Sequence, residues 1–263
     1  MSTLIDTLNL AWPLAKRDVM ARYRGSLAGM LWALIGPLAM VGIYSAVFQG
    51  VFKARWAGPA GSTGGGIDFA LRVFAGLIVF SAVAEVASRA TRLMQDNANL
   101  VKRVVFPLEL LCVALVLQVG LHAGVQLLVL GVLQGVFGSG LGGSLVWLLA
   151  VVPWLAILML ALALAFASLG CYLRDLQHLV PLMTSGLLFL SPVFYSQAAA
   201  PEPLRVVLAA NPLTGPIEAL RAACFGDAFG WPELLPQLAL ELLALWAARA
   251  LFARLRPGFA DLV

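Results

Sequence analysis

The stretch between Glu109 and Arg174 contains no lysine, arginine, aspartate or glutamate, and no other feature of the chain constrains its fold as strongly. A helix needs about 20 predominantly apolar residues to cross the hydrocarbon layer of a bilayer. The stretch is therefore long enough for two crossings. A cluster of glycines and serines near its middle, in residues 135–144, marks the turn between them. The sequence predicts a membrane-spanning helical hairpin here.

The composition of the whole chain agrees with a membrane protein. Of its 263 residues, 62% are hydrophobic and only 11% are charged, and the mean hydropathy is +0.95. Soluble domains contain about 25% charged residues. Because helices satisfy their own backbone hydrogen bonds in lipid, and the apolar runs show no strand alternation, we expect an all-α integral membrane protein. The three cysteines have no CxxC spacing and predict neither a disulfide framework nor a metal site.

Six apolar segments predict six transmembrane helices in one domain that covers residues 1–263. The predicted spans are residues 27–52, 69–88, 107–134, 145–171, 179–195 and 234–252. Residues 1–26 precede them and carry apolar side chains at three- and four-residue steps, a pattern typical of an amphipathic helix at a membrane interface. This apolar stripe consists of Leu4, Ile5, Leu8, Trp12, Ala15, Val19 and Tyr23.

The segments between the spans contain shorter predicted elements. Residues 88–106 are polar and long enough to form a short helix outside the membrane. Residues 196–233 contain five prolines, and the pieces 204–210 and 217–225 predict two short re-entrant helices that dip into the outer leaflet.

Two groups of polar residues lie inside the predicted spans. Glu85 precedes Arg89 by four residues, which favours an ion pair within one helix over proton chemistry. Gln118, His122 and Gln126 share one helix face, a pattern typical of hydrogen bonds between helices, with a substrate or proton role as the alternative.

The distribution of basic residues predicts the orientation of the chain. With six spans, both ends lie on one side of the membrane, and that side receives twelve of the 17 basic residues. Cytoplasmic loops carry such an excess, so we expect both termini in the cytoplasm. The twelve are Lys16, Arg17, Arg22, Arg24, Arg89, Arg92, Lys102, Arg103, Arg174, Arg249, Arg254 and Arg256. The net charge is +4, and most of the 17 basic residues lie at the ends of the predicted spans, so the charge does not indicate a nucleic-acid partner.

Several kinds of chemistry find no support in the sequence. There is no G-x-x-x-x-G-K-[ST] motif, and none of the three lysines follows a glycine, so any ATP must be hydrolysed by a partner. HExxH, GxSxG and paired-cysteine motifs are also missing. The acids Glu85, Glu109 and Glu241 lack the clustering of a catalytic or metal site, and only Glu241 is placed for proton-coupled transport. We therefore expect no catalytic residue and no metal ligand.

Beyond its composition, the chain carries a series of local motifs. The first runs from Arg17-Asp18 through Arg22-Tyr23-Arg24-Gly25-Ser26-Leu27-Ala28-Gly29-Met30-Leu31-Trp32 to Pro37. The others are Asn99-Leu100-Val101-Lys102-Arg103-Val104-Val105-Phe106-Pro107, Tyr172-Leu173-Arg174-Asp175-Leu176, Ser191-Pro192-Val193-Phe194-Tyr195, Asn211-Pro212-Leu213-Thr214 and Phe259-Ala260-Asp261. In this order they resemble the permease subunits of type-2 ABC exporters that move bacterial surface polysaccharides such as O-antigen, teichoic acid and capsule.

The resemblance implies partners, a cargo and a cellular location. The expected assembly is a homodimer of six-span subunits in the bacterial plasma (inner) membrane, bound to two copies of a cytoplasmic ABC ATPase subunit. ATP and Mg²⁺ belong to that partner, and no cofactor is expected on this chain. The expected cargo is a lipid-linked polysaccharide.

The resemblance also implies roles for particular residues. Contacts with the ATPase are expected at Arg17, Arg22, Tyr23, Arg24, Asn97, Asn99 and Arg103, and a cytoplasmic gate or link at Arg174 and Asp175. The first and fifth spans would face each other across the dimer axis. The channel-lining residues would then be Trp32, Tyr44, Phe48, Phe189, Phe194 and Tyr195.

Two alternative functions remain open at this stage. A type-2 exporter of small molecules or lipo-oligosaccharide would share the fold and the partner, and the sequence separates it from a polysaccharide exporter only through the resemblance of the motifs. Neighbouring genes for glycosyltransferases and sugar-nucleotide enzymes beside an ATPase gene would favour the polysaccharide exporter. A membrane scaffold for glycan assembly, without transport, would not depend on an ATPase subunit.

Overall fold

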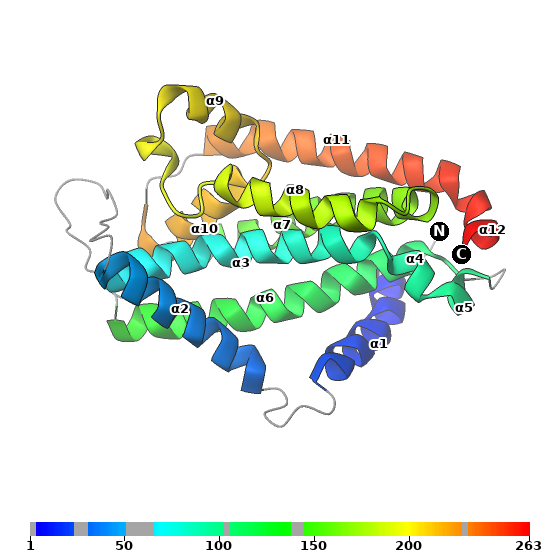
Figure 1. The fold of residues 1–263 in the computed structure, drawn as a ribbon, viewed down its shortest axis with the longest axis horizontal. Coiled ribbons are helices and arrows are strands. Elements are labelled where there is room, and N and C mark those ends of the chain that lie inside the picture. Colours follow the sequence, from blue (N-terminus) through cyan, green and yellow to red (C-terminus); the bar gives the residue numbers. More distant parts are fainter. Residues whose placement is uncertain (1–3, 24–30, 51–65, 103–105, 138–144, 228–230) are drawn as a thin grey trace.

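A computed structural model of the chain describes residues 4–23, 31–50, 66–102, 106–137, 145–227 and 231–263 (Figure 1). These ranges are almost wholly helical and contain no strand, which confirms the predicted all-α class. Within them, three helices are long and apolar enough to cross a membrane: Ile67–Ala90, Glu109–Phe137 and Leu148–Tyr172. Such helices are expected of a multi-pass membrane protein, whereas the total of six spans stays a prediction.

Four long helices form the body of the molecule. They are α3 (Gly66–Ala90), α6 (Glu109–Phe137), α7 (Leu145–Tyr172) and α11 (Trp231–Leu255), and they run along its long axis (Figure 1). Helix α3 packs against α2, α6, α7, α8 and α10, and its side chains Leu71, Ile78 and Val86 are buried. A helix that is apolar on all sides is typically surrounded by other helices in this way.

Two shorter apolar helices, α2 (Trp32–Gly50) and α8 (Leu176–Phe189), lie at the periphery. Helix α8 ends six residues before the end of the predicted span 179–195. Proline 192 provides the reason, because it lacks an N–H group and disfavours helical backbone in Ser191 before it. With 14 residues, α8 is about 21 Å long, shorter than the hydrocarbon layer of about 30 Å.

Helix α1 (Leu4–Tyr23) confirms the predicted helix near the start of the chain, but its buried face agrees with the predicted stripe only in part. Ala11, outside the stripe, is buried against Leu110 and Ala114 of α6. Within the stripe, Ala15 is also buried, whereas Trp12 is 49% exposed. Small side chains allow the two helices to approach closely, so the packing face is centred on the alanines. The location of α1 at a membrane interface stays a prediction.

Both termini lie at the same end of the molecule, here called the termini end, together with α4, α5 and α12 (Figure 1). The single short helix predicted in residues 88–106 is instead two one-turn helices, α4 (Leu93–Asp96) and α5 (Ala98–Val101). Asn97 separates them and its side-chain amide donates to the Leu93 carbonyl, a local bond that competes with a continuous helix. After η3 (Arg256–Gly258), α12 (Phe259–Leu262) buries Phe259 against Phe252.

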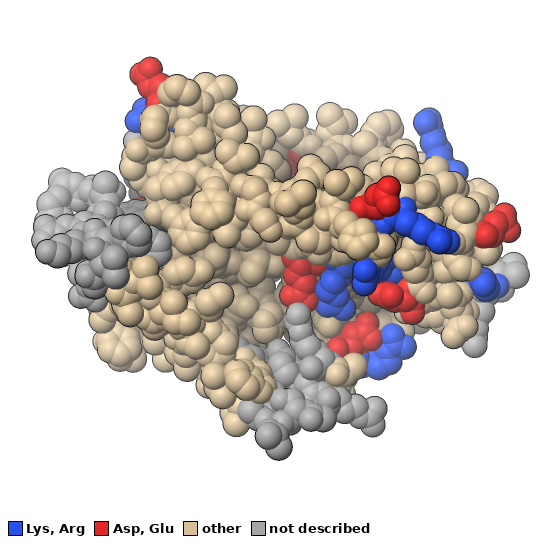
Figure 2. Space-filling model, in the orientation of Figure 1, with Lys and Arg blue, Asp and Glu red and all other residues tan. Residues whose placement is uncertain are grey.

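The opposite end, here called the far end, carries η2 (Gln197–Ala199), α9 (Glu202–Ala210) and α10 (Thr214–Phe225). The two short helices predicted in residues 196–233 are confirmed as helices, each starting two or three residues earlier than expected. Their re-entrant position stays a prediction. Figure 2 shows that most charged side chains of the visible face lie in the half toward the termini end, with a few more at the top of the far end.

Candidate functional site

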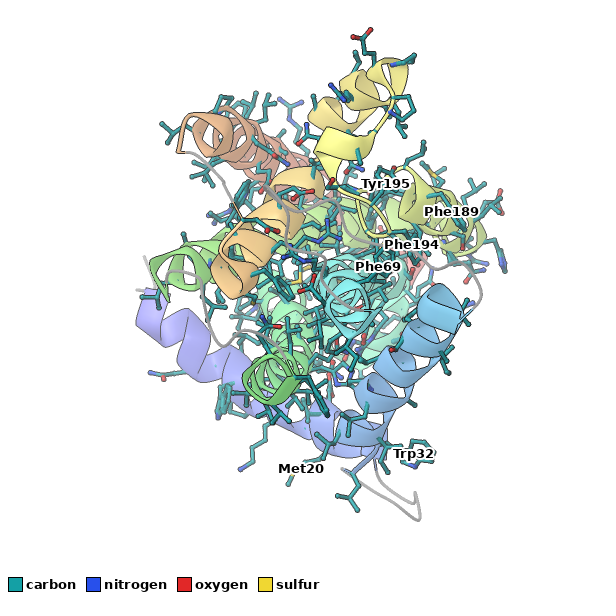
Figure 3. All side chains as sticks on the ribbon, turned by 90° about the vertical axis from the view of Figure 1, so that its left-hand side faces the viewer. Met20, Trp32, Phe69, Phe189, Phe194 and Tyr195 are labelled. Atoms are coloured by element: carbon teal, nitrogen blue, oxygen red, sulfur yellow. The ribbon has the colours of Figure 1, made fainter. Side chains whose placement is uncertain are left out.

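Three of the six aromatic residues predicted to line a channel lie together at the far end. The Phe194 ring centroid is 6.1 Å from that of Phe189 and 6.2 Å from that of Tyr44. Phe194 also packs against the buried Phe69 of α3. Figure 3, seen from the far end, shows Phe69, Phe189 and Phe194 close to one another. These four residues, Tyr44, Phe69, Phe189 and Phe194, are called the aromatic cluster below.

The remaining predicted channel residues take different positions. Tyr195 follows the cluster directly, and its hydroxyl donates to the Phe189 carbonyl at 2.9 Å, which ties it to the last turn of α8. Trp32 is 52% exposed and lies away from the cluster, at the first residue of α2 (Figure 3). Phe48 belongs to α2, but its side chain lies outside the described residues. The structure therefore brings together the rings at one end of the predicted channel.

The segment Leu190–Tyr195, here called the aromatic turn, connects α8 to the elements of the far end. The Asn211 side-chain amide donates to the Leu190 carbonyl and to the Ser191 hydroxyl oxygen, each at 2.9 Å. Its own carbonyl oxygen accepts from the Leu213 N–H at 2.9 Å. Two of the sequence motifs, Ser191–Tyr195 and Asn211–Thr214, thus meet in space. Both motifs can be recognised in the sequence, but their spacing does not predict this contact.

A buried cluster of charges lies next to the turn, at the start of α3. Arg72 donates through Nε to Asp68 at 2.9 Å, and its Nη1 pairs with Asp227. The guanidinium also lies 4.6 Å from the Phe225 ring centroid, a cation–π distance. Because Phe225 ends α10 and Asp227 follows it, Arg72 joins α3 to the end of α10. From the sequence, Arg72 is only one of the five basic residues expected on the side away from the cytoplasm.

Asn99, Arg174 and Asp175, which were predicted to contact an ATPase or to form the cytoplasmic link, lie at the termini end. Asn99 is exposed on α5, and Arg174 and Asp175 are exposed in the three-residue connection between α7 and α8. Arg92 donates through Nε to the Gln177 side-chain oxygen at 2.9 Å, so the residue before α4 is joined to the first turn of α8. Helices α4 and α5, together with Arg92 and residues 173–177, are called the polar platform below.

The N-terminal residues of the docking prediction are described only in part. Arg17 is exposed on α1 and forms an ion pair with Asp18 at 2.9 Å. Arg22 and Tyr23 belong to α1, but their side chains lie outside the described residues. Arg24 and Arg103 lie outside the described residues altogether. The docking role of all these residues stays a prediction.

Polar residues predicted inside the spans form contacts both within one helix and between helices. Glu85 and Arg89 make the expected ion pair at 3.0 Å. Arg89 also donates through Nη2 to the Gln118 side-chain oxygen at 2.8 Å, which joins α3 to α6. The predicted role of Gln118 in a hydrogen bond between helices is confirmed.

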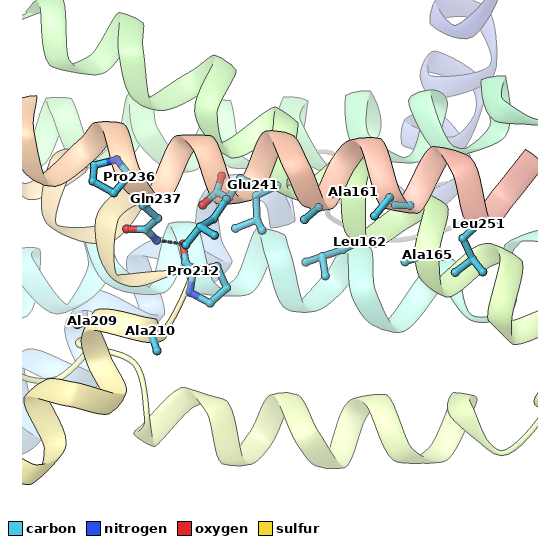
Figure 4. Close-up of a pocket in the computed structure, with 15 residues that line it drawn as sticks. Ala161, Leu162, Ala165, Ala209, Ala210, Pro212, Pro236, Gln237, Glu241 and Leu251 are labelled. Atoms are coloured by element: carbon cyan, nitrogen blue, oxygen red, sulfur yellow. Dashed lines mark hydrogen bonds between the residues drawn. The ribbon is translucent and has the colours of Figure 1, made fainter.

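An elongated cavity of about 650 Å³ lies between α7, α11 and the end of α9 (Figure 4). Its walls are mostly alanine and leucine, and Gln237 at one end donates to the Pro212 carbonyl at 2.6 Å. Glu241 lines the same cavity and is 3% exposed. The acid that the sequence singled out in the last span is thus buried beside an apolar cavity.

Comparison with known proteins adds information about the whole chain. Residues 9–225 match the model of the family described as ABC-2 type transporter. Two proteins of Klebsiella pneumoniae named O-antigen export system permease protein RfbA are 23% and 22% identical over 254 residues, which are 95% of this chain and 93% of theirs. A Myxococcus xanthus protein of the same name is 25% identical over 257 residues, covering 94% of this chain and 93% of its own.

Proposed function

Because the chain belongs to the ABC-2 type transporter family, we propose that it is the permease subunit of an exporter for a lipid-linked, O-antigen-like polysaccharide. The observation that carries the proposal is the similarity, over 93% of their length or more, to three proteins named as O-antigen export permeases. Family membership makes the chain a membrane component of a transporter and indicates no enzymatic family. The polysaccharide and its direction of movement belong to the proposal.

An ATPase partner supplies the energy in this proposal. The sequence holds no phosphate-binding loop, so ATP hydrolysis takes place on a separate subunit. Two copies of that subunit bind a homodimer of this chain at the termini end, where charged residues gather (Figure 2). In this orientation the termini end lies on the cytoplasmic side of the bacterial inner membrane, and the far end lies on the opposite side. The exposed Asn99, Arg174 and Asp175 of the polar platform are available for this contact.

The aromatic cluster suits a polymer that must slide. Sugar rings present apolar C–H faces as well as hydroxyl groups, and aromatic rings bind such faces weakly. Stacking on aromatic platforms tolerates different units of a polymer, as it does for single-stranded nucleic acids. Conduction also requires that binding at each site is weak enough for the cargo to leave. A channel between two copies, with Phe189 and Phe194 at the far end of the molecule, would combine stacking that tolerates different sugar units with weak binding at each site.

The decisive experiment is deletion of the gene, followed by location of the glycan. We expect polysaccharide to accumulate in the cytoplasm and to return to the cell surface when the wild-type gene is supplied. Phe194→Ala should lower surface glycan while leaving the amount of ATPase that copurifies unchanged. Phe137→Ala, on an exposed position of α6, is the matched control and should export normally.

The two alternative functions predict other outcomes. An exporter of small molecules or lipo-oligosaccharide would leave surface polysaccharide unchanged after deletion. A scaffold for glycan assembly would stop synthesis rather than cause cytoplasmic accumulation, and it would not depend on a copurifying ATPase. Either outcome would overturn the proposal.

A further inference from the structure

Arg221 of α10 is completely buried, and it binds the backbone of the aromatic turn. Its Nη1 donates to the Pro192 carbonyl at 2.6 Å, and its Nη2 donates to the Val193 carbonyl at 2.7 Å. The two acceptors belong to consecutive residues, so the two ends of the planar guanidinium match them as a fork. A longer contact of 3.4 Å reaches the Tyr195 carbonyl. Phe194 therefore lies between Val193 and Tyr195, whose carbonyl groups both accept hydrogen bonds from Arg221.

The same side chain is anchored to the body of the molecule. Its Nε donates to the Arg72 carbonyl of α3 at 3.2 Å, so the guanidinium bridges α3 and the turn. Glu218, one helical turn earlier on α10, accepts from Arg221 at 3.3 Å and from the Gln197 N–H at 3.3 Å. Together with Asn211, these side chains bind backbone groups from Leu190 to Gln197. The aromatic turn is thus fixed by one side of α10 and the loop before it.

A glycine on α3 provides independent support for this arrangement. A Cβ atom at Gly76 would lie 2.9 Å from Arg221 Nη2, 3.2 Å from Val193 Cα and 3.3 Å from the Val193 carbonyl oxygen. A larger residue would therefore push the turn or the guanidinium away from α3. The close approach of three elements at this point needs both the glycine and the arginine.

Burying a guanidinium is costly, because the charged form loses its water. This burial lowers the pKa of Arg221 to about 10, which still leaves the side chain charged at neutral pH. A charged donor makes stronger hydrogen bonds to carbonyls than a neutral donor does. Burying the Arg221 charge thus costs free energy, and the strong hydrogen bonds that the charge makes connect α10 rigidly to the aromatic turn.

We propose that Arg221 is a positioning residue that holds the aromatic turn, and with it the Phe194 ring, in the place where the polysaccharide passes. This inference rests on the proposed export function. Arg221 does not touch the cargo in this arrangement. It acts through the backbone of Pro192 and Val193, and its loss releases the ring without removing it.

The test compares two arginine-to-lysine substitutions in the complex with the ATPase. Arg221→Lys keeps the positive charge but loses the planar fork, whereas Arg205→Lys changes an arginine of the neighbouring α9 that donates to the Ala200 carbonyl. Losing one charge-assisted hydrogen bond shifts an equilibrium by about tenfold. We therefore expect Arg221→Lys to lower surface glycan and substrate-stimulated ATPase activity by about that factor, with basal ATPase activity unchanged. Arg205→Lys should match the wild type.

A spin label measures the turn directly and does not depend on export. The label is placed at Ser196→Cys in a background in which Cys112, Cys171 and Cys224 are replaced. We expect an immobile label in the wild type and in Arg205→Lys, and a mobile label in Arg221→Lys. Ser191→Ala, which removes one acceptor of Asn211, should give a smaller change in the same direction and serves if Arg221→Lys does not fold.

The two readouts separate the possible failures. An immobile label together with normal export in Arg221→Lys and Ser191→Ala overturns the positioning role. A loss of basal ATPase activity in Arg221→Lys, equal to the loss of stimulated activity, indicates a general structural defect and also overturns it. If the wild type exports no glycan while the label still responds to Arg221→Lys, the proposed function fails and only the contact to the turn stands.

Discussion

At the scale of single residues, a tight backbone contact lies where α7 crosses the junction of α3 and α4. A Cβ atom at Gly170 would lie 2.1 Å from the Thr91 carbonyl oxygen. Backbone atoms cannot rotate away as a side chain can, so Gly170→Ala must push α7 off α3. We expect a loss of about 2 kcal/mol or more in the free energy of unfolding, measured as a lower thermal midpoint in detergent.

The matched control for this substitution is Gly124→Ala on α6. Among the described residues, no atom outside its own stretch of helix lies within 4 Å of a Cβ atom at this position. Alanine favours a helix over glycine by up to about 1 kcal/mol, so the control should be unchanged or slightly more stable. Equal midpoints for the two variants would show that the contact at Thr91 is not tight in solution.

Glu218 gives the far end a pH dependence that can be predicted. Its burial raises the pKa of the carboxyl group above the ordinary value of 4.5, although the Arg221 charge acts in the opposite direction. A carboxyl group whose pKa is raised in the folded state contributes stability at low pH, and this stability is lost as the pH rises through the folded pKa. Glu218→Gln should therefore weaken the fall of the thermal midpoint as the pH rises above the ordinary pKa of a glutamate.

The measurement is the difference in midpoint between Glu218→Gln and the wild type at each pH. Because other groups titrate equally in both proteins, they cancel in this difference. We expect the difference to move in favour of the variant as the pH rises. A difference that moves toward the wild type would mean that the ion pair with Arg221 outweighs the cost of burial.

At the scale of elements, the contact between α4 and the start of α8 is the part of the polar platform that can transmit motion. Arg92→Ala removes the hydrogen bond to Gln177, which is worth about 1 kcal/mol. We expect export and ATPase activity of the complex to fall together by roughly two- to tenfold, since such a loss weakens the coupling of α4 to α8. The amount of protein in the membrane should not change.

Arg254→Ala is the control, because Arg254 is an exposed arginine at the same end of the molecule. Arg254→Ala removes one positive charge, as Arg92→Ala does, but it leaves the hydrogen bond between Arg92 and Gln177 in place. Export should therefore stay close to the wild-type level. A similar fall in both variants would show that the charge of this end matters and the contact between Arg92 and Gln177 does not.

The long helices could be predicted from the sequence, and the ends of the shorter ones could not. Apolar runs bounded by charges or glycines predicted α3, α6 and α7 to within a few residues. Residues 190–195 are as apolar as α8 itself, so hydropathy extended that span beyond the point where Pro192 ends the helix. Likewise, a polar stretch predicts a helix outside the membrane but does not reveal the break at Asn97.

At the scale of the whole molecule, the sequence predicted which residues matter better than it predicted where they meet. The motifs pointed to Phe189 and Phe194, and the structure brings both to Tyr44. Nothing in the spacing could indicate that Asn211 binds Ser191, because such a contact depends on how α10 packs against α3. Trp32 shows the same limit, because it belongs to α2 together with Tyr44, yet only Tyr44 lies in the aromatic cluster.

The proposed homodimer can be tested on the exposed apolar face of α8. Leu182 and Met183 are 70% and 68% exposed on α8, and Leu182, seven residues before Phe189, lies on the same helix face as Phe189. If the two copies pair through the first and fifth spans, a cysteine at Met183 should form a crosslink between copies in a background without Cys112, Cys171 and Cys224. Oxidation in native membranes followed by gel electrophoresis measures the dimer.

The control cysteine replaces Leu128 of α6, which is 73% exposed and therefore as accessible as Met183. In Figure 1, α6 and α8 lie on opposite sides of α3, so one interface cannot cover both. Crosslinking at Met183 with none at Leu128 fits a channel that places the two aromatic clusters on facing sides. Crosslinking at Leu128 alone would put α6 at the dimer axis, and the aromatic clusters of the two copies would then face lipid instead of a shared passage.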